Sequence, residues 1–242
     1  MSEPAQGDRG DGTGSVSRQG YFDQWSALHG GVDPSGSRVI SGYLSAMYLA
    51  ARPFVAVGAS PNAVTLMGLV VAACAPLGVR AGGVGVLLAV VAIAISGLLD
   101  GVDGAVAVIT GSTSPWGAVL DSVVDRMQEA MYLLALYFAG APGWLCVAGG
   151  ATVWLSEYAR ARAGASGMTE IGVVTPFERP TRIAVAAMFL LAGFVYQQRL
   201  EWWASAGAWV WFALALVSLV LLLVVIRRRL SSPGGPGEKA TN

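Results

Sequence analysis

The chain has 242 residues, of which 55% are hydrophobic and 12% are charged, and its mean hydropathy is +0.59. Ordinary soluble domains carry about 25% charged residues, so this composition excludes a typical soluble enzyme and predicts a membrane protein. The formal net charge is zero, and we expect no nucleic-acid partner because the chain has no surplus of basic residues.

The N-terminal segment is polar and rich in Gly and Ser, as in MSEPAQGDRGDGTGSVSRQG. It lacks the apolar core of a signal peptide, so residues 1–38 are expected to be disordered or weakly ordered. His29, the only histidine, lies there and is given no catalytic role. Residues 39–55 place apolar side chains at helical spacing and predict an interfacial juxtamembrane helix.

Residues 56–230 contain six apolar segments and are predicted to form a transmembrane catalytic domain, followed by a polar tail over 231–242. Ser60 and Pro61 are suited to the N-cap and first turn of the first span. The predicted fold is an all-α polytopic membrane protein with six transmembrane helices, preceded by the N-terminal interfacial amphipathic helix. The expected spans cover residues 61–79, 82–99, 117–139, 143–160, 183–198 and 203–226.

Arginines indicate the orientation of these spans. An even number of spans places both termini on one side, and most arginines fall on that side: Arg38, Arg52, Arg160, Arg162, Arg179, Arg182 and Arg227 to Arg229. Because cytoplasmic loops carry an excess of Lys and Arg, both termini and the loops around 100–117 and 160–182 are expected in the cytoplasm, in a cell inner or plasma membrane.

Four aspartates flank the second predicted connection between spans. Asp100 and Asp103 end the second span, and Asp121 and Asp125 begin the third. Spacings of i,i+3 and i,i+4 place each pair on one helical face, and the short hairpin brings both pairs to the same side of the membrane. A charged side chain in a membrane segment costs roughly 2.5 to 3.5 kcal/mol, and four acids would repel one another unless cations bridged them.

Carboxylates without an accompanying histidine or cysteine favour Mg²⁺ or Mn²⁺ over zinc. Four of them can hold two ions and leave coordination positions for phosphate oxygens. The sequence therefore predicts a two-metal site suited to diphosphate chemistry. Isolated helix-terminal charges in headgroup water are the alternative, and the four spacings together disfavour it.

The pattern Asp100-x2-Asp103-Gly104-x2-Ala107-x9-Gly117-x3-Asp121-x3-Asp125 resembles the defining motif of the CDP-alcohol phosphotransferase family. Seven of eight motif positions match, and the likeness extends over the six-span core. In the family an arginine follows the alanine, whereas this chain has Val108.

The resemblance implies roles for individual residues. Asp100 and Asp121 would contact both metals, Asp103 the first and Asp125 the second, and Asp125 would also be the general base. The acceptor hydroxyl would attack the lipid-side phosphorus of CDP-diacylglycerol and release CMP. By the same analogy, the residues that line the CDP-lipid pocket would be Asn62, Thr65, Gly104, Ala107, Ser114 and Gly117. A homodimer is also expected from the resemblance.

A basic segment, YARARAGASGMTEIGVVTPFERPTR, follows the fourth span. It is similar to the loop of actinobacterial phosphatidylinositol-phosphate synthases, in which basic residues bind a phosphorylated inositol. The implied acceptor is a phosphorylated polyol such as inositol phosphate or glycerol phosphate, bound by Arg160, Arg162, Arg179 and Arg182. These arginines are alternatively topology signals and contacts for anionic lipids.

Three acid and arginine side chains near the site are assigned structural roles, namely Arg126, Glu129 and Glu157, which are expected to form ion pairs. Cys74 and Cys146 lie in apolar runs and are expected to be small apolar residues without a disulfide.

Four other functions are alternatives, and the expected architecture excludes the first of them. A membrane polyprenyl transferase also uses acidic motifs, but such enzymes resemble bundles of eight or nine spans with well-separated motifs. A cation transporter usually places its acids near the midplane between repeats, which are not visible here. A cardiolipin synthase-like enzyme would use phosphatidylglycerol as the acceptor. A non-catalytic family member is supported only by Val108.

Overall fold

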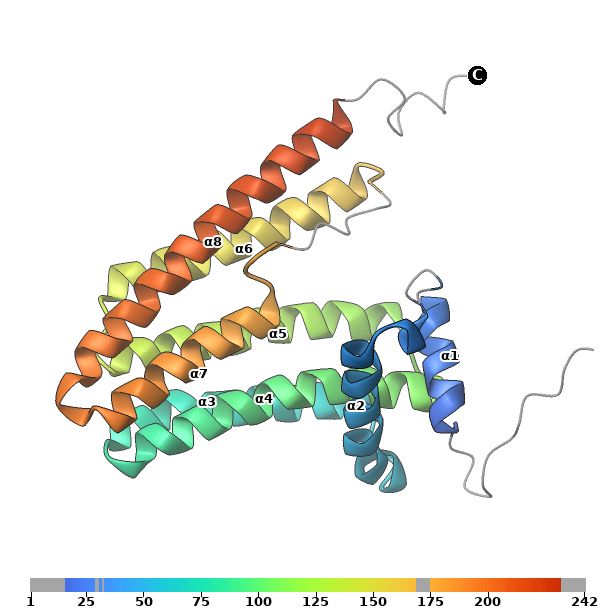
Figure 1. The fold of residues 1–242 in the computed structure, drawn as a ribbon, viewed down its shortest axis with the longest axis horizontal. Coiled ribbons are helices and arrows are strands. Elements are labelled where there is room, and N and C mark those ends of the chain that lie inside the picture. Colours follow the sequence, from blue (N-terminus) through green and yellow to red (C-terminus); the bar gives the residue numbers. More distant parts are fainter. Residues whose placement is uncertain (1–15, 29–30, 32, 169–174, 232–242) are drawn as a thin grey trace, which may run out of the picture. The chain divides into compact units, whose positions relative to one another are not determined.

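The computed structural model describes residues 16–28, 31, 33–168 and 175–231. All regular structure in these ranges is helical, which confirms the predicted all-α class. In chain order the helices, with η marking short 3-10 turns, are α1 (Arg18–Leu28), η1 (Pro34–Gly36), α2 (Arg38–Ala56), α3 (Pro61–Ala81), α4 (Val84–Ile109), α5 (Pro115–Phe138), α6 (Gly143–Ala165), α7 (Arg179–Val195), η2 (Gln197–Arg199) and α8 (Leu200–Leu230) (Figure 1).

The helices belong to two compact units. Unit 1 comprises residues 1–69 and 96–124, and unit 2 comprises residues 70–95 and 125–242. The boundary passes through α3, α4 and α5, so each of these helices contributes residues to both units.

In unit 1, the short helix α1 packs against α2. The ring of Tyr21 lies 5.8 Å from that of Tyr48, and Arg18 donates a hydrogen bond of 2.6 Å to Ser45 Oγ. The prediction of a disordered or weakly ordered segment over residues 1–38 is therefore corrected for α1. The reason is that Tyr21 and Phe22 are buried within an otherwise polar stretch. Of the predicted tail over residues 231–242, all but Ser231 lies outside the described residues.

Two helices that begin in unit 1 each start at a Ser-Pro pair. Ser60 Oγ accepts a hydrogen bond from the backbone N–H of Ala63 at 3.2 Å, immediately before Pro61 opens α3. Ser114 Oγ accepts one from the N–H of Gly117 at 3.0 Å, and Pro115 opens α5. Each hydroxyl thus satisfies a backbone donor that the first helical turn leaves free.

Four helices in the described part of the chain are long and apolar enough to cross a membrane: Arg38–Ala56, Pro61–Ala81, Val84–Ile109 and Gln197–Leu230. They indicate an integral membrane protein. The first of them is the segment predicted to lie on the membrane surface. The other three expected spans correspond to α5, α6 and α7. They are not among these four helices: α5 and α6 carry charged residues of the site described below, and α7, which begins with Arg179 and carries Arg182, has only 17 residues.

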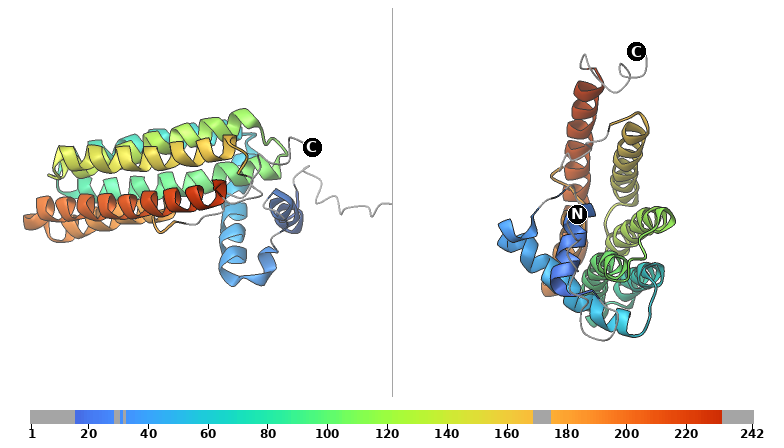
Figure 2. Two further views of the ribbon diagram at one scale, coloured as in Figure 1. Left: turned by 90° about the horizontal axis from the view of Figure 1, so that it is seen from above. Right: turned by 90° about the vertical axis from the view of Figure 1, so that its right-hand side faces the viewer.

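Unit 2 has a large apolar core, in which α8 lies beside α6 and α7 (Figures 1 and 2). Trp211 of α8 is fully buried, and its ring meets that of Phe177 edge-on with centroids 5.2 Å apart. A Cβ atom at Gly149 of α6 would lie 2.9 Å from the Trp211 ring, so glycine is required for this close approach. The same core holds the segment before α7 in place.

Candidate active site

Three of the four predicted aspartates converge in unit 1. Asp100 and Asp103 of α4 and Asp121 of α5 each offer a carboxylate oxygen, and these oxygens all lie within 4.8 Å of one another. Asp103 is buried, with 6% of its surface exposed. The predicted convergence is thus confirmed for these three residues. Asp125, the fourth, is one helical turn further along α5 and belongs to unit 2.

The cluster is suited to a hard divalent cation. Its donors are carboxylate oxygens alone, which match the oxygen preference of Mg²⁺ and Mn²⁺. Three acids this close together within apolar helices repel one another strongly unless a cation or protons offset their charge. Thr65 of α3 donates a hydrogen bond of 2.5 Å to Asp103 Oδ2, which orients that carboxylate in the manner of residues that support metal ligands.

The structure also gathers several of the residues predicted to bind the CDP-lipid. A Cβ atom at Gly117 would lie 3.1 Å from Ser114 Oγ and 3.5 Å from Asn62 Oδ1, so these three residues are neighbours. Gly104 is exposed and borders open space, since nothing lies within 4 Å of a Cβ atom placed there. Ala107 is partly buried one turn further along α4.

At two positions of unit 1, the surroundings in the structure differ from what the family resemblance implies. The hydroxyl of Thr65 donates to Asp103, and Thr65 is 5% exposed, so it orients a carboxylate of the aspartate cluster. Val108, which stands at the motif arginine, is 8% exposed and packs in the apolar interior of the unit.

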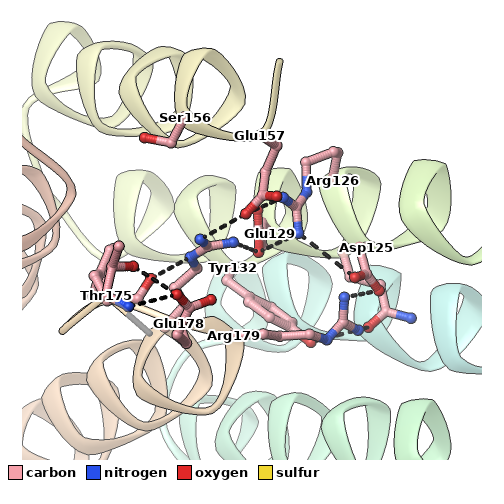
Figure 3. A network of polar contacts seen from close by, with 12 residues as sticks. Asp125, Arg126, Glu129, Tyr132, Ser156, Glu157, Thr175, Glu178 and Arg179 are labelled. Atoms are coloured by element: carbon pink, nitrogen blue, oxygen red, sulfur yellow. Dashed lines mark hydrogen bonds and ion pairs between the residues drawn. The ribbon is translucent and has the colours of Figure 1, made fainter. Parts of the chain in front are cut away.

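Unit 2 contains a network of arginines and carboxylates on α5, α6 and the start of α7 (Figure 3). The ion pairs within it join Arg126 to Asp125, Glu129 and Glu157, Arg160 to Glu157 and Glu178, Arg179 to Asp125, and Arg182 to Glu129 and Glu157. The predicted structural pairing of Arg126, Glu129 and Glu157 is therefore confirmed. In the part of the chain that the structure describes, the network contains four arginines and four carboxylates.

Arg182 is the most deeply placed arginine of this network, at 3% exposed. Its guanidinium donates to Glu129 at 2.7 Å, to Glu157 at 3.1 Å and to the carbonyl of Phe177 at 2.9 Å. These three protein acceptors hold it in one orientation. Arg182 therefore joins α5, α6 and α7 within unit 2.

The pairing predicts a stability effect at Arg182. The Arg182→Ala variant is expected to lower the free energy of unfolding by about 3 kcal/mol, because Glu129 is then left buried beside Arg126 alone. Thermal unfolding in detergent would measure the loss. The double variant Arg182→Ala, Glu129→Gln should recover part of it, since the uncompensated charge is gone; additive losses would contradict this pairing.

Hydrogen bonds at Thr175, Phe177 and Glu178 hold the segment before α7. Phe177 is buried, and its backbone N–H donates to Ser218 Oγ of α8 at 3.1 Å. Glu178 Oε1 accepts hydrogen bonds from the Thr175 N–H at 2.9 Å and from its hydroxyl at 2.7 Å. Burial raises the pKa of Glu178, but the hydrogen bonds from Thr175 and the charge of Arg160 outweigh it and hold that pKa below its usual value. Glu178 is thus a stable anionic anchor at the start of α7.

The four arginines predicted to bind the acceptor differ in their surroundings. Arg182 is buried, whereas Arg160 and Arg179 are partly buried beside carboxylates. Arg162 lies exposed in the last turn of α6, and the described residues include no ion pair to it. Arg160 pairs with Glu178 at the start of α7, and Arg179 is the next residue and pairs with Asp125 of α5, so both remain candidates for an anion site.

Gln128 was not predicted as part of the site. It is 1% exposed, and its Oε1 accepts hydrogen bonds from Arg179 at 2.9 Å and from the hydroxyl of Tyr132 at 3.2 Å. Its position three residues after Asp125 places it on the same side of α5. That spacing was the available signal, although it does not specify the arginine partner.

Comparisons with known proteins agree with this description. The family model of the CDP-alcohol phosphatidyltransferases matches residues 59–224. An archaetidylinositol phosphate synthase of Aeropyrum pernix is 37% identical over 62% of this chain and 77% of its own length. A phosphatidylinositol phosphate synthase of Mycobacteroides abscessus is 30% identical over 73% of this chain and 80% of its own length.

A solved structure has the same fold. The phosphatidylinositol phosphate synthase of Mycobacterium tuberculosis, in complex with manganese and citrate, has a TM-score of 0.62 at 22% identity and covers 78% of this chain and 90% of its own. A second structure of that protein, with CDP-DAG bound, has a TM-score of 0.60 at 24% identity, covering 78% of this chain and 95% of its own.

The all-α fold and the three clustered aspartates agree with a transferase that acts on CDP-linked alcohols, the class whose family model matches. The chain belongs to the CDP-alcohol phosphatidyltransferase family. It is accordingly an enzyme of phospholipid synthesis.

Proposed function

We propose that the chain transfers the phosphatidyl group of CDP-diacylglycerol to a phosphorylated polyol, with inositol phosphate as the preferred acceptor, and releases CMP. The observation that carries this proposal is the pairing of Arg179 with Asp125, because it sets a phosphate-binding side chain beside the proposed base. The names of the relatives in Aeropyrum pernix and Mycobacteroides abscessus support an inositol-containing product.

Asp100, Asp103, Asp121 and Asp125 would hold two Mg²⁺ or Mn²⁺ ions. The three clustered carboxylates support this assignment, and the i,i+4 spacing of Asp121 and Asp125 on α5 adds the fourth. When bound, the ions would offset the negative charge of the diphosphate oxygens. Manganese in the related mycobacterial structure agrees with this choice of metal.

The remaining steps use residues of the chain. Asn62, Ser114 and Gly117 would border the cytidine end of the donor, and the open space beside Gly104 would admit its diphosphate. Asp125 would accept the proton of the acceptor hydroxyl. The hydroxyl oxygen then forms a bond to the lipid-side phosphorus while the bond from that phosphorus to CMP breaks.

The arginines would hold the phosphate of the acceptor. Arg160, Arg162 and Arg179 can donate paired hydrogen bonds to an anion. Arg182 would act on the same site indirectly, because its guanidinium nitrogens already donate hydrogen bonds to three acceptors within the protein.

We propose six membrane spans, α3 to α8, with both termini and the active site in the cytoplasm and α2 lying on the membrane surface. The distribution of arginines supports this orientation. A homodimer is proposed from the family resemblance alone.

A variant of Arg179 tests whether the acceptor carries a phosphate. Arg179→Ala should raise the acceptor KM about ten-fold or more, because a charge-assisted contact contributes roughly 1.5 to 3 kcal/mol, whereas the KM for CDP-diacylglycerol stays the same. Steady-state CMP release with inositol phosphate measures both constants. The matched control is Arg199→Ala, which removes an exposed arginine beyond the far end of α7. Normal kinetics of Arg179→Ala with every phosphorylated polyol would favour phosphatidylglycerol or an unphosphorylated alcohol as the acceptor.

A further inference from the structure

Arg179 has two partners on α5. It forms an ion pair with Asp125 (Figure 3), and its other terminal nitrogen donates a hydrogen bond of 2.9 Å to Gln128. The side chains of Arg179 and Asp125 are 13% and 16% exposed. Their attraction is therefore only weakly screened by solvent and salt.

The other arginines of the network depend on different acids. Arg182 and Arg160 pair with Glu129, Glu157 and Glu178, and none of these three acids belongs to the aspartate motif. Arg126 reaches Asp125 only at 3.6 Å and has shorter contacts to Glu129 and Glu157. Arg179 is thus the arginine whose principal ion-pair partner is a proposed metal ligand.

A divalent cation and Arg179 compete for the same carboxylate. One negative charge on Asp125 attracts the guanidinium, and a cation of charge +2 bound to that carboxylate both offsets this attraction and repels the arginine. The neutral Gln128 remains as a hydrogen-bond partner, but it does not neutralise the positive charge. The guanidinium is then available to an anion.

We propose that Asp125 retains Arg179 until a metal ion occupies the aspartate site, so that metal loading frees Arg179 to bind the phosphate of the acceptor. This coupling rests on the proposed function, specifically on Asp125 as a metal ligand and on Arg179 as an acceptor ligand. It gives the enzyme an order of binding in which the metal precedes the acceptor. The unloaded enzyme therefore binds the acceptor weakly.

Linkage makes the coupling reciprocal. If the metal weakens the hold of Asp125 on Arg179, then Arg179 must weaken the binding of the metal by the same factor. Couplings between two sites are typically in the range of about 5-fold to 150-fold. The effect of Arg179 on metal affinity can therefore be measured without any substrate.

The first test measures the affinity of the purified full-length chain for Mn²⁺, with free Mn²⁺ followed by electron paramagnetic resonance and no donor or acceptor present. Arg179→Ala should bind Mn²⁺ at least about five-fold more tightly than the unchanged protein. Arg160→Ala is the matched control, because it removes the same charge from Glu157 and Glu178 and should leave the affinity near its original value. An unchanged or weaker affinity in Arg179→Ala overturns the coupling.

Asp125→Asn separates the coupling from the function on which it rests. This variant should lose affinity for Mn²⁺, and adding Arg179→Ala to it should give no further tightening. If Asp125→Asn binds Mn²⁺ normally, the ligand role of Asp125 is wrong and the coupling fails with it. If Asp125→Asn binds weakly and Arg179→Ala does not tighten binding, only the coupling fails.

The second test follows the acceptor. Calorimetric titration of inositol phosphate should show tighter binding with Mn²⁺ than with EDTA, by at least about five-fold, and Arg179→Ala should lose most of this dependence on Mn²⁺. Arg160→Ala should keep the dependence even where its overall affinity is lower. Equal dependence in both variants would show that the phosphate responds to the metal without Arg179, which overturns the proposal.

Discussion

EDTA is expected to abolish the release of CMP from CDP-diacylglycerol, and added Mg²⁺ or Mn²⁺ is expected to restore it. Without the cation, Asp100, Asp103 and Asp121 would repel both one another and the diphosphate of the donor. Metal ions contribute several kcal/mol of charge stabilisation in such reactions, and each 1.36 kcal/mol corresponds to a ten-fold change in rate. The expected fall is therefore about 100-fold or more, measured as CMP formed per unit time.

The Asp103→Asn variant weakens metal binding by a change in the protein, as EDTA does by removing the ion. It keeps the size of the side chain and can retain the contact with Thr65, but it removes one charged ligand, so a higher Mg²⁺ concentration should be needed for half-maximal rate. CMP release that persists in EDTA would contradict a metal-dependent transferase. Ion flux in vesicles without any CMP release would instead support a transporter.

Asp125→Asn is expected to lower kcat by at least the ~100-fold that is typical of lost general-base catalysis. The amide is nearly the same size as the carboxylate, so the fold should be retained, although Arg179 loses its ion-pair partner. Single-turnover CMP release with donor and acceptor saturating measures the chemical step. Asp33→Asn is the control and should keep the normal rate. It changes an exposed carboxylate that accepts a hydrogen bond from the Ser35 hydroxyl. A near-normal kcat in Asp125→Asn would remove the assigned base.

The aspartate cluster could be predicted because its information is local. Asp100 and Asp103 are three residues apart on one helix, and a short connection leads to Asp121. Helical periodicity converts such spacings into a shared face. The start of α3 could also be predicted, since Ser60 precedes a proline and caps the helix. The third span was expected from residue 117, whereas α5 begins at Pro115 with Ser114 as its cap.

The arginine network could be predicted only in part. Arg182 and Glu129 are 53 residues apart, and no local periodicity relates them. The sequence therefore indicated that arginines would gather after α6 but gave Arg179 and Arg182 the same role. The structure separates them by burial, because Arg182 is inside the helical packing and Arg179 faces Asp125. Helix α1 was not predicted because its apolar side chains, such as Tyr21 and Phe22, are few.

The buried pair of Glu129 and Arg182 constrains how this enzyme can diversify. Changing Arg182 alone leaves Glu129 with Arg126 as its ion-pair partner, and changing Glu129 alone leaves Arg182 with Glu157. Either change weakens the compensation of a buried charge, so viable sequence changes at these two positions should occur together. Arg162 is exposed and has no such constraint among the described residues. Efforts to redirect the enzyme toward a different acceptor should accordingly begin at Arg162, where a single substitution changes the local charge without disturbing the helices.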